Sequence, residues 1–302
     1  MLRVLVGFVT LSCIAAAFWG WTIWSIYFAG GPTIIEQPSA ENEVRVVPLA
    51  DGFHVLEGAG GNITVMDGED GLLVIDTGYE RMAPSVLTAL RSITNTPVIT
   101  VVNTHGHDDH TGGNVAIAGD TARVAAQSWT LDDIRDHVGA EFLGKLPNIV
   151  VEERHEFQFN GQTIRLIHTP FAHTAGDIVA VFEPANIIVA GDTLVTNALP
   201  YLSLRTGATL DGHLAAQTLI IALSDADTLV VPGHGEITDR GGVIEVNSDL
   251  QRIRNRLARL KSLGLPREAA LLLHPLRGWP KSREVDGDWE KFWISIVWET
   301  LP

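Results

Sequence analysis

One short stretch, the six residues from His105 to His110, most constrains what this chain can fold into. It holds four side chains that can bind a metal ion, which are His105, His107, Asp109 and His110. The apolar, β-branched run Pro97–Asn103 before it is typical of a buried strand. Residues i and i+2 of an extended chain point to the same side, so His105 and His107 are placed to converge on one ion. Imidazole and carboxylate ligands together suit zinc, and less selectively iron or manganese.

The residues that follow favour a second ligand pair. Gly106 allows a sharp turn between the two histidines, and Thr111–Asn114 suits the start of a helix. This helix would aim Asp109 and His110 at a second position nearby. The alternative is a polar, solvated turn that is rich in histidine. Because 3 of the 11 histidines fall at this one strand end, we favour the metal site.

Composition narrows the function classes. A chain of 302 residues, 46% of them hydrophobic, is long enough for one large domain or two small ones. The formal net charge of −15 argues against a nucleic-acid partner, which needs clustered Lys and Arg. The single cysteine, Cys13, rules out a disulfide framework and a thiolate metal site.

The N-terminal segment predicts a membrane anchor. Residues 4–29 carry no charge and are long enough to cross a bilayer, with aromatic residues crowding the second half. Arg3 precedes this run and Glu36 follows it, so the positive-inside rule puts the rest of the chain outside the cytoplasm, on the periplasmic or extracellular side. The alternative is a cleaved signal peptide and a secreted protein. We favour the anchor because Pro32 follows the small residues 29–31 and would hinder cleavage.

Three segments are expected on this basis. Residues 1–31 form the anchor or signal segment, residues 32–43 a polar linker, and residues 44–302 one folded domain. In that domain, short apolar or alternating runs between Gly and Asp turns predict strands at 44–49, 53–56, 62–66, 72–75, 98–102, 123–126, 156–159, 162–167, 177–182, 186–190 and 228–231. Helical spacing of apolar residues predicts helices at 82–93, 130–138, 210–223 and 242–263.

This order of elements predicts an α/β (α+β) fold with two sheets packed face to face and helices outside. The first four strands resemble an antiparallel meander. Residues 139–147 are less regular and are expected to form a loop over the site. The tail tryptophans Trp279, Trp289, Trp293 and Trp298 are expected to pack on the domain rather than to bind a ligand.

Three further stretches each place one ligand-capable side chain beside glycines near a strand. His173 lies in a turn between two predicted strands, Asp192 follows the strand at 186–190, and His234 follows the strand at 228–231. Each motif alone is typical of an ordinary turn. Their recurrence at strand ends favours one shared metal site.

Five motifs in this order resemble the metallo-β-lactamase superfamily over roughly residues 44–240. They are Asp76-Thr77-Gly78, the cluster at 105–110, His173, Gly191-Asp192-Thr193 and Pro232-Gly233-His234-Gly235. The stretch 170–177, and Leu199-Pro200-Tyr201 followed by residues 209–212, resemble a cyclase-like branch of general hydrolases.

The resemblance implies a four-layer αββα sandwich, preceded here by one transmembrane or signal helix, with a binuclear metal site at one edge. His105, His107 and His173 would bind the first ion, and Asp109, His110 and His234 the second. Asp192 would bridge both ions, and Asp76 would orient the site. The implied cofactors are two divalent metal ions, with zinc favoured over iron or manganese.

The implied function is hydrolysis of an ester, thioester, lactone or amide in a small-molecule substrate, by attack of a metal-bridging hydroxide. Asp109 would orient the hydroxide or relay a proton. Tyr201 is a candidate oxyanion donor, with a packing role favoured, and His168 and His213 are candidates for the surroundings of the site. Specificity is expected in loops at 53–61, 139–149 and 197–208.

Two alternatives stay open. Asp192, with no cysteine available, differs from the cysteine-containing true β-lactamases and favours thioesterase, lactonase or general hydrolase branches over a β-lactam hydrolase. An iron-binding redox protein on the same fold is the other alternative. It is disfavoured because such proteins usually carry a flavin-binding partner domain, for which this chain has no room.

Overall fold

The computed structural model describes residues 43–137, 147–280 and 287–301. The predicted anchor and linker at 1–42, and most of the predicted loop at 139–147, therefore lie outside the described residues. Among the residues that the structure does describe, no helix combines the length and the apolar character needed to cross a membrane.

The first sheet has seven strands in the order β1-β2-β3-β4-β5-β6-β7. Its first four strands form the predicted antiparallel meander, and its last three are added in parallel. The strands are β1 (Arg45–Ala50), β2 (Phe53–Glu57), β3 (Ile63–Met66), β4 (Leu72–Ile75), β5 (Val98–Val102), β6 (Arg123–Gln127) and β7 (Ile149–Val151). Apolar side chains fill both faces of β3 and β4, as expected for strands covered on both sides.

The second sheet has six strands in the order β13-β12-β11-β10-β9-β8. The strands are β8 (Arg154–Phe159), β9 (Gln162–His168), β10 (Ile178–Glu183), β11 (Ile187–Val195), β12 (Leu229–His234) and β13 (Thr238–Asp239). All neighbours are antiparallel except β11 and β12, which are parallel because helix α6 (Leu210–Leu223) connects them.

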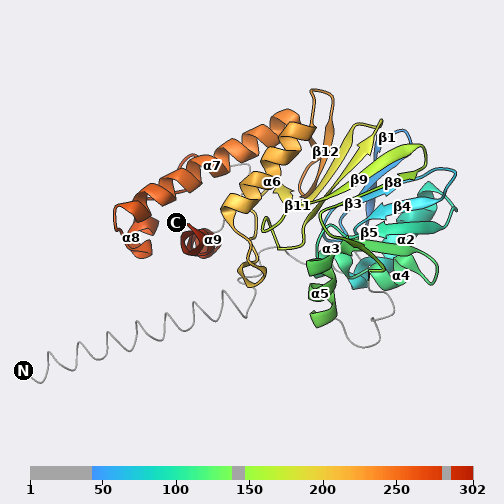
Figure 1. Ribbon diagram of the computed structural model, residues 1–302, viewed down its shortest axis with the longest axis horizontal. Helices are drawn as coiled ribbons and strands as arrows, with labels where there is room; N and C mark the ends of the chain where they lie inside the picture. The colour runs from blue at the N-terminus through green and yellow to red at the C-terminus, as the bar shows by residue number, and fades with distance from the viewer. Residues whose placement is uncertain (1–42, 138–146, 281–286, 302) are drawn as a thin grey trace, which may run out of the picture.

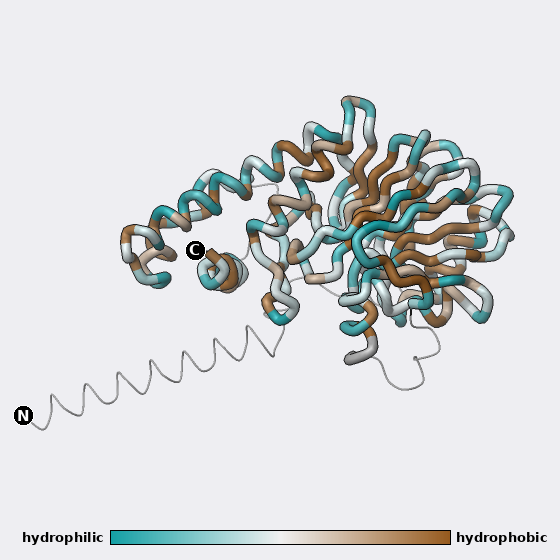
Figure 2. Tube along the Cα trace, in the orientation of Figure 1, coloured by the Kyte–Doolittle hydropathy of each residue, from teal (hydrophilic) through white to brown (hydrophobic). Residues whose placement is uncertain are grey.

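The two sheets pack face to face over a shared apolar core. Phe53 of β2 and Phe182 of β10 meet there edge to face, with ring centroids 5.3 Å apart. Figure 1 shows helices on both outer faces, and Figure 2 shows hydrophobic residues concentrated along the strands between them. The predicted two-sheet α/β architecture with outer helices is therefore confirmed for the described residues.

Helices α2 (Ala83–Ile93) and α4 (Asn114–Ala118) cover the first sheet, and α6, α7 (Arg240–Ser262) and α9 (Gly287–Thr300) cover the second. The shorter helical elements are η1 (Glu80–Met82), α3 (Asp108–Thr111), α5 (Ser128–His137), η3 (Leu204–Thr206) and α8 (Arg267–Leu272). Trp289, Trp293 and Trp298 are buried among the apolar residues over the second sheet, and Trp279 packs against them. The expectation that these tryptophans pack on the domain is confirmed.

One strand boundary differs from the prediction in a way that matters for the site. Strand β11 continues through Gly191-Asp192-Thr193 to Val195 instead of ending at Ala190. The backbone at Gly191 has a φ of 52°, and the pairing with β12 shifts register there before it resumes at Val195 and His234. Asp192 therefore projects from an irregular stretch within a strand rather than from a turn after it.

Candidate metal centre

All seven predicted ligands meet at one edge of the sandwich, where strands of both sheets end. Their ligand atoms form three overlapping groups, each with all atoms within 4.8 Å: His105, His107 and His173; His105, His110 and Asp192; Asp109, His110 and His234. The first sheet supplies four of the residues through β5 and α3, and the second sheet supplies His173, Asp192 and His234. The structure thus brings together residues separated by more than a hundred positions in the chain.

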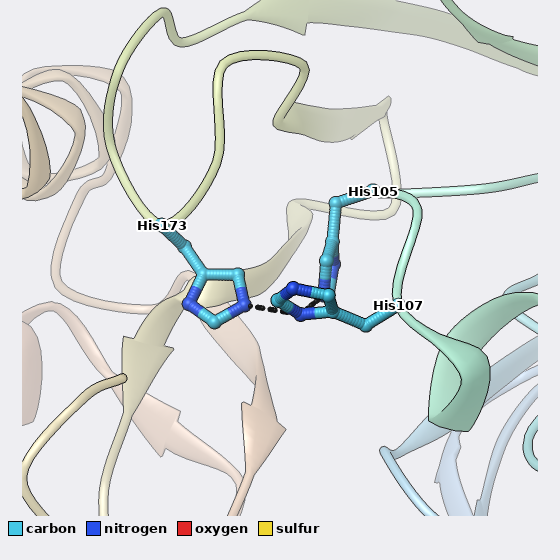
Figure 3. A group of neighbouring side chains, drawn as sticks. All are labelled: His105, His107 and His173. Carbon is cyan, nitrogen blue, oxygen red and sulfur yellow. Dashed lines mark hydrogen bonds between the residues drawn. The ribbon is translucent and has the colours of Figure 1, made fainter. Parts of the chain in front are cut away.

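The first group consists of His105, His107 and His173, whose rings converge in Figure 3. His107 Nδ1 lies 3.0 Å from His105 Nε2 and 2.8 Å from His173 Nε2. The other nitrogen of His173, Nδ1, donates to the backbone carbonyl of Tyr201 at 2.7 Å, so its Nε2 carries a lone pair. Burial lowers the pKa of His173 to about 3.

Neutral rings are what a metal site requires of its histidines. Burial also lowers the pKa of His105 and of His107, and in His105 the neighbouring imidazoles lower it further. Each neutral ring carries a single N–H, and that of His173 is directed at Tyr201, so the three nitrogens that face one another are short of hydrogens. The arrangement suits a cation at their centre.

The second group consists of Asp109, His110 and His234. Asp109 Oδ2 lies 3.1 Å from His234 Nε2 and 3.6 Å from His110 Nε2. Burial alone would raise the pKa of Asp109, but His110 and His234 hold it well below its usual value. Asp109 is therefore an anion beside two imidazoles.

Asp192 stands between the two groups. Its Oδ1 lies 3.2 Å from His110 Nε2 and 3.5 Å from His234 Nε2, and its Oδ2 lies 3.4 Å from His173 Nε2. Burial would raise the pKa of Asp192, but these three histidines hold it well below the usual range. One carboxylate oxygen thus faces each group.

Two orphaned atoms show that the residues fit a cation. His110 Nε2 and Asp192 Oδ1 are buried and have no hydrogen-bond partner. A buried polar atom left in that state costs about 1–3 kcal/mol. A cation held by both atoms would satisfy them at once, and the mixed nitrogen and oxygen donor set fits a divalent ion such as zinc.

Asp76 holds His110, one of the predicted ligands, in place. Its side chain accepts hydrogen bonds from His110 Nδ1 at 2.7 Å, from the Thr104 hydroxyl at 2.7 Å and from the Thr104 amide at 2.8 Å. The bond to Nδ1 leaves His110 Nε2 to face Asp109 and Asp192. A carboxylate behind a metal-binding histidine is a recurrent feature of such sites.

Sequence reasoning missed two residues that support the ligand loops. Asp177 accepts hydrogen bonds from the amides of His173 and Thr174 at 2.8 and 2.7 Å, and burial raises its pKa to about 8. Asn62 donates to the carbonyls of Pro232 and Gly235, both at 3.0 Å, and so fixes the loop that carries His234. Asp177 ends a stretch quoted for the resemblance, whereas nothing in the sequence marks Asn62.

The histidines expected near the site make supporting contacts instead of offering ligand atoms. His168 Nε2 lies 2.7 Å from the carbonyl oxygen of Ala175 and ties down the His173 loop. His213 is fully buried on α6, with its Nε2 at 3.1 Å from Gln217 Nε2. The Tyr201 ring forms a wall of the first group, with its centroid 5.9 Å from those of His107 and His173.

A cavity of about 150 Å³ opens beside the first group, between α5 and the turn around η3. Trp129 and Thr130 line it from the helix, Thr174 from the His173 loop, and Arg205 from the turn. Arg205 is ion-paired with Asp133, which joins the two walls. The mixed apolar and polar lining and the nearby ligands suit a small organic substrate.

Comparisons with known proteins agree with this geometry. A family model described as "Metallo-beta-lactamase superfamily" matches residues 56–234. A metallo-beta-lactamase type 2 from Bacillus cereus is 24% identical over 195 residues, which cover 63% of this chain and 73% of that protein. A hydroxyacylglutathione hydrolase from Nitrosococcus oceani is 28% identical over 166 residues, 54% of this chain and 58% of that protein.

Among solved structures, the sec-alkylsulfatase Pisa1 from Pseudomonas sp. is similar, with a TM-score of 0.63 and 15% identity. The similarity covers 85% of this chain and 50% of that one, so the present chain spans about half the length of that enzyme. At this identity the likeness concerns the fold alone.

Proposed function

The chain belongs to the metallo-beta-lactamase superfamily and is a metal-dependent hydrolase, and we propose that it cleaves an ester or thioester bond of a small molecule with two divalent cations. The observation that carries the proposal is the placement of Asp192, whose two oxygens face two different histidine groups. A carboxylate in that position is suited to bridge two ions.

Seven side chains would hold the cations. His105, His107 and His173 would bind the first, Asp109, His110 and His234 the second, and Asp192 both. Zinc is the favoured ion, because imidazole nitrogens dominate the donor set. When bound, two such ions lower the pKa of coordinated water toward neutrality and polarise a scissile carbonyl.

The chain's own residues prepare the site for this chemistry. Tyr201 and Asp76 fix the protonated nitrogens of His173 and His110, which leaves the opposite nitrogen of each ring to act as a ligand. Asp109 is the proposed catalytic residue. Its carboxylate is held ionised by His110 and His234, so it is able to orient an attacking water by accepting a hydrogen bond from it.

The bond class is proposed from the ligand set and the relatives. The only cysteine of the chain is Cys13, and the aspartate Asp192 distinguishes the ligand set from that of the cysteine-containing β-lactam hydrolases, which are the competing class. The hydroxyacylglutathione hydrolase relative supports a thioester or ester substrate, and the metallo-beta-lactamase relative keeps the β-lactam as the competing bond.

The test is hydrolysis by the full chain, once loaded with zinc and once treated with a chelator. The panel contains a thioester, an aryl ester, a lactone, a β-lactam and a phosphodiester, and the metal content of each sample is measured alongside. We expect two zinc ions per chain and chelator-sensitive turnover of the thioester or the aryl ester. The variant Asp109→Asn should keep the fold and lose most of that turnover, about 100-fold or more.

The other outcomes are distinguishable. Turnover of the β-lactam alone would contradict the proposed ester or thioester substrate but would agree with the proposed two-metal site. Two bound ions with turnover of none of the five compounds would contradict the substrate class. A loaded chain that retains no metal would overturn the proposal as a whole.

A further inference from the structure

The C-terminal helix α9 lies beyond residues 56–234, which the family model matches, yet it contacts the segment beside the metal centre. Trp289 and Trp293 are four residues apart, so both lie on one face of the helix. The indole N–H of the fully buried Trp293 donates to the carbonyl oxygen of Pro200 at 2.7 Å. The ring of Trp289 stacks on Tyr201, with centroids 6.4 Å apart and planes inclined by 22°.

The segment that α9 contacts holds His173 from two directions. The carbonyl of Tyr201 accepts from His173 Nδ1 at 2.7 Å, and the amide of Ser203 donates to the His173 carbonyl at 2.9 Å. The ring of Tyr201 also packs against the His107 and His173 rings, with centroids 5.9 Å apart in both cases. The position of Tyr201 therefore sets both the tautomer of His173 and the direction of its Nε2.

We propose that α9 is a positioning element of the metal centre, in which Trp293 and Trp289 fix Pro200 and Tyr201 and thereby aim His173 at the first cation. The inference rests on the proposed function, because it takes His173 as a ligand. The carbonyl that accepts from Trp293 belongs to Pro200, and the carbonyl that accepts from His173 Nδ1 belongs to the next residue, Tyr201. A shift of Pro200 away from the indole therefore also moves the Tyr201 carbonyl.

Another tryptophan on the same helix provides a matched control. Trp298 is buried over the second sheet like Trp293. In the described part of the chain, its indole forms no hydrogen bond or ring stack with residues 199–203, and its backbone carbonyl accepts from Lys261 Nζ at 2.9 Å. A change of Trp298 to Phe should thus test the packing of α9 without touching the Pro200 bond.

The experiment compares the full chain with its variants Trp293→Phe and Trp298→Phe. Both variants keep an aromatic ring, and only the first loses the hydrogen bond to Pro200. Zinc affinity is measured by competition with a chromophoric chelator, and Co²⁺ is added as a spectroscopic probe of the histidine ligands. We expect Trp293→Phe to weaken the binding of one of the two zinc ions by about 10-fold and to alter the absorption spectrum of Co²⁺ bound at that position. Trp298→Phe should bind both ions like the parent chain.

A second measurement needs no metal. Amide hydrogen exchange is followed in the metal-free chains at Ser203, which donates to His173, and at Ala208, which donates to the Ser203 carbonyl at 3.1 Å. Exchange at both should be several-fold faster in Trp293→Phe than in Trp298→Phe, while the amides of β5 exchange alike in the two variants. A general loss of packing would instead raise exchange in both variants equally.

The result that would overturn this inference differs from the result that would overturn the proposed function. If Trp293→Phe matches Trp298→Phe in both affinity and exchange, α9 only packs on the sheet and this inference is overturned. If the parent chain binds no divalent ion at all, the proposed function fails, and the role assigned here to His173 fails with it.

Discussion

Asp192 occupies a position that no other residue of the centre shares, because its two oxygens face different histidine groups. Among the described histidines, those within 4 Å of the Asp109 carboxylate are His110 and His234. We therefore predict that Asp192→Asn weakens the binding of both cations, by at least about 100-fold each, whereas Asp109→Asn weakens only one. Metal content after dialysis against a weak chelator measures this directly. A variant Asp192→Asn that keeps one ion at parental affinity would contradict the bridging role.

His213, near the site, is a buried residue that makes the stability of the folded chain depend on pH. Gln217 Oε1 accepts from Asn247 at 3.3 Å, so its amide nitrogen donates both to His213 Nε2 and to the Thr193 carbonyl. His213 must then carry its proton on Nδ1, which is buried and has no partner in the described structure. A second proton has no acceptor, and burial lowers the pKa of His213 to about 4.

This pKa gives a prediction with a defined sign. The unfolded chain takes up a proton at His213 below pH of about 6.5, whereas the folded chain resists it until about pH 4, so the free energy of unfolding falls as the pH drops through this window. The loss is about 1.4 kcal/mol per pH unit, or roughly 2 kcal/mol between pH 6.5 and pH 5. The free energy of unfolding is measured with urea at pH 7 and pH 5 for the metal-free chain and for metal-free His213→Gln. Between these two pH values it should fall by roughly 2 kcal/mol less in the variant than in the parent chain. Equal declines would show that His213 does not carry the effect.

At the scale of elements, the turns that hold the ligands depend on two glycines. A Cβ at Gly233 would lie 1.9 Å from Asp192 Oδ1, and a Cβ at Gly61 would lie 2.3 Å from His110 Cε1. Both distances are far inside contact, so the β2–β3 turn and the end of β12 fit the ligands only without a side chain. We predict that Gly61→Ala and Gly233→Ala each cost about 1–3 kcal/mol of stability and displace one ligand.

The measurement is metal content together with thermal unfolding, and Gly287→Ala is the control. A Cβ at Gly287 would meet no atom of the described residues within 4 Å. The two site variants should lose at least one equivalent of bound metal, whereas the control should keep both. Full metal content in Gly233→Ala would mean that Asp192 can move aside without loss of binding.

Elements with local signals could be predicted from the sequence. Strands β4 and β5 have the predicted bounds because each is a short apolar run closed by a polar turn, and α6 has the predicted bounds because apolar residues recur along its whole length. The candidate ligands could be identified for the same reason, since each stands beside such a strand, and the structure brings them together. Helix α9 was not predicted, because its buried face has a partner only once α7 and the Pro200 segment are in place.

Contacts between distant segments left no local signal. Asn62 reaches Pro232 across 170 residues, and its role depends wholly on how the two sheets meet. The same holds for Trp293, which is 93 residues from Pro200. The short strands β7 and β13 were also missed, because two or three residues carry too little periodicity to reveal a strand.

At the scale of the whole molecule, the centre joins the two halves of the sandwich. His105, His107, Asp109 and His110 belong to the first sheet and its connections, and His173, Asp192 and His234 to the second. In both proposed ligand groups, residues from the two sheets meet. Bound ions would therefore act as cross-links between the sheets in addition to any catalytic role.

This cross-link leads to a prediction for stability. A ligand that binds only the folded chain stabilises it by RT ln(1 + [L]/Kd), about 4 kcal/mol at a thousandfold excess over Kd. For a domain of this size that corresponds to a rise of roughly 10 °C in the melting temperature. Calorimetry of the zinc-loaded chain before and after chelation should show this difference, and zinc added back should restore it. Because Asp192 contacts ligands of both groups, Asp192→Asn should show little response to the chelator. A parent chain that binds two ions and melts at the same temperature without them would show that the ions bind the unfolded chain equally well, and would contradict sites that only the two packed sheets complete.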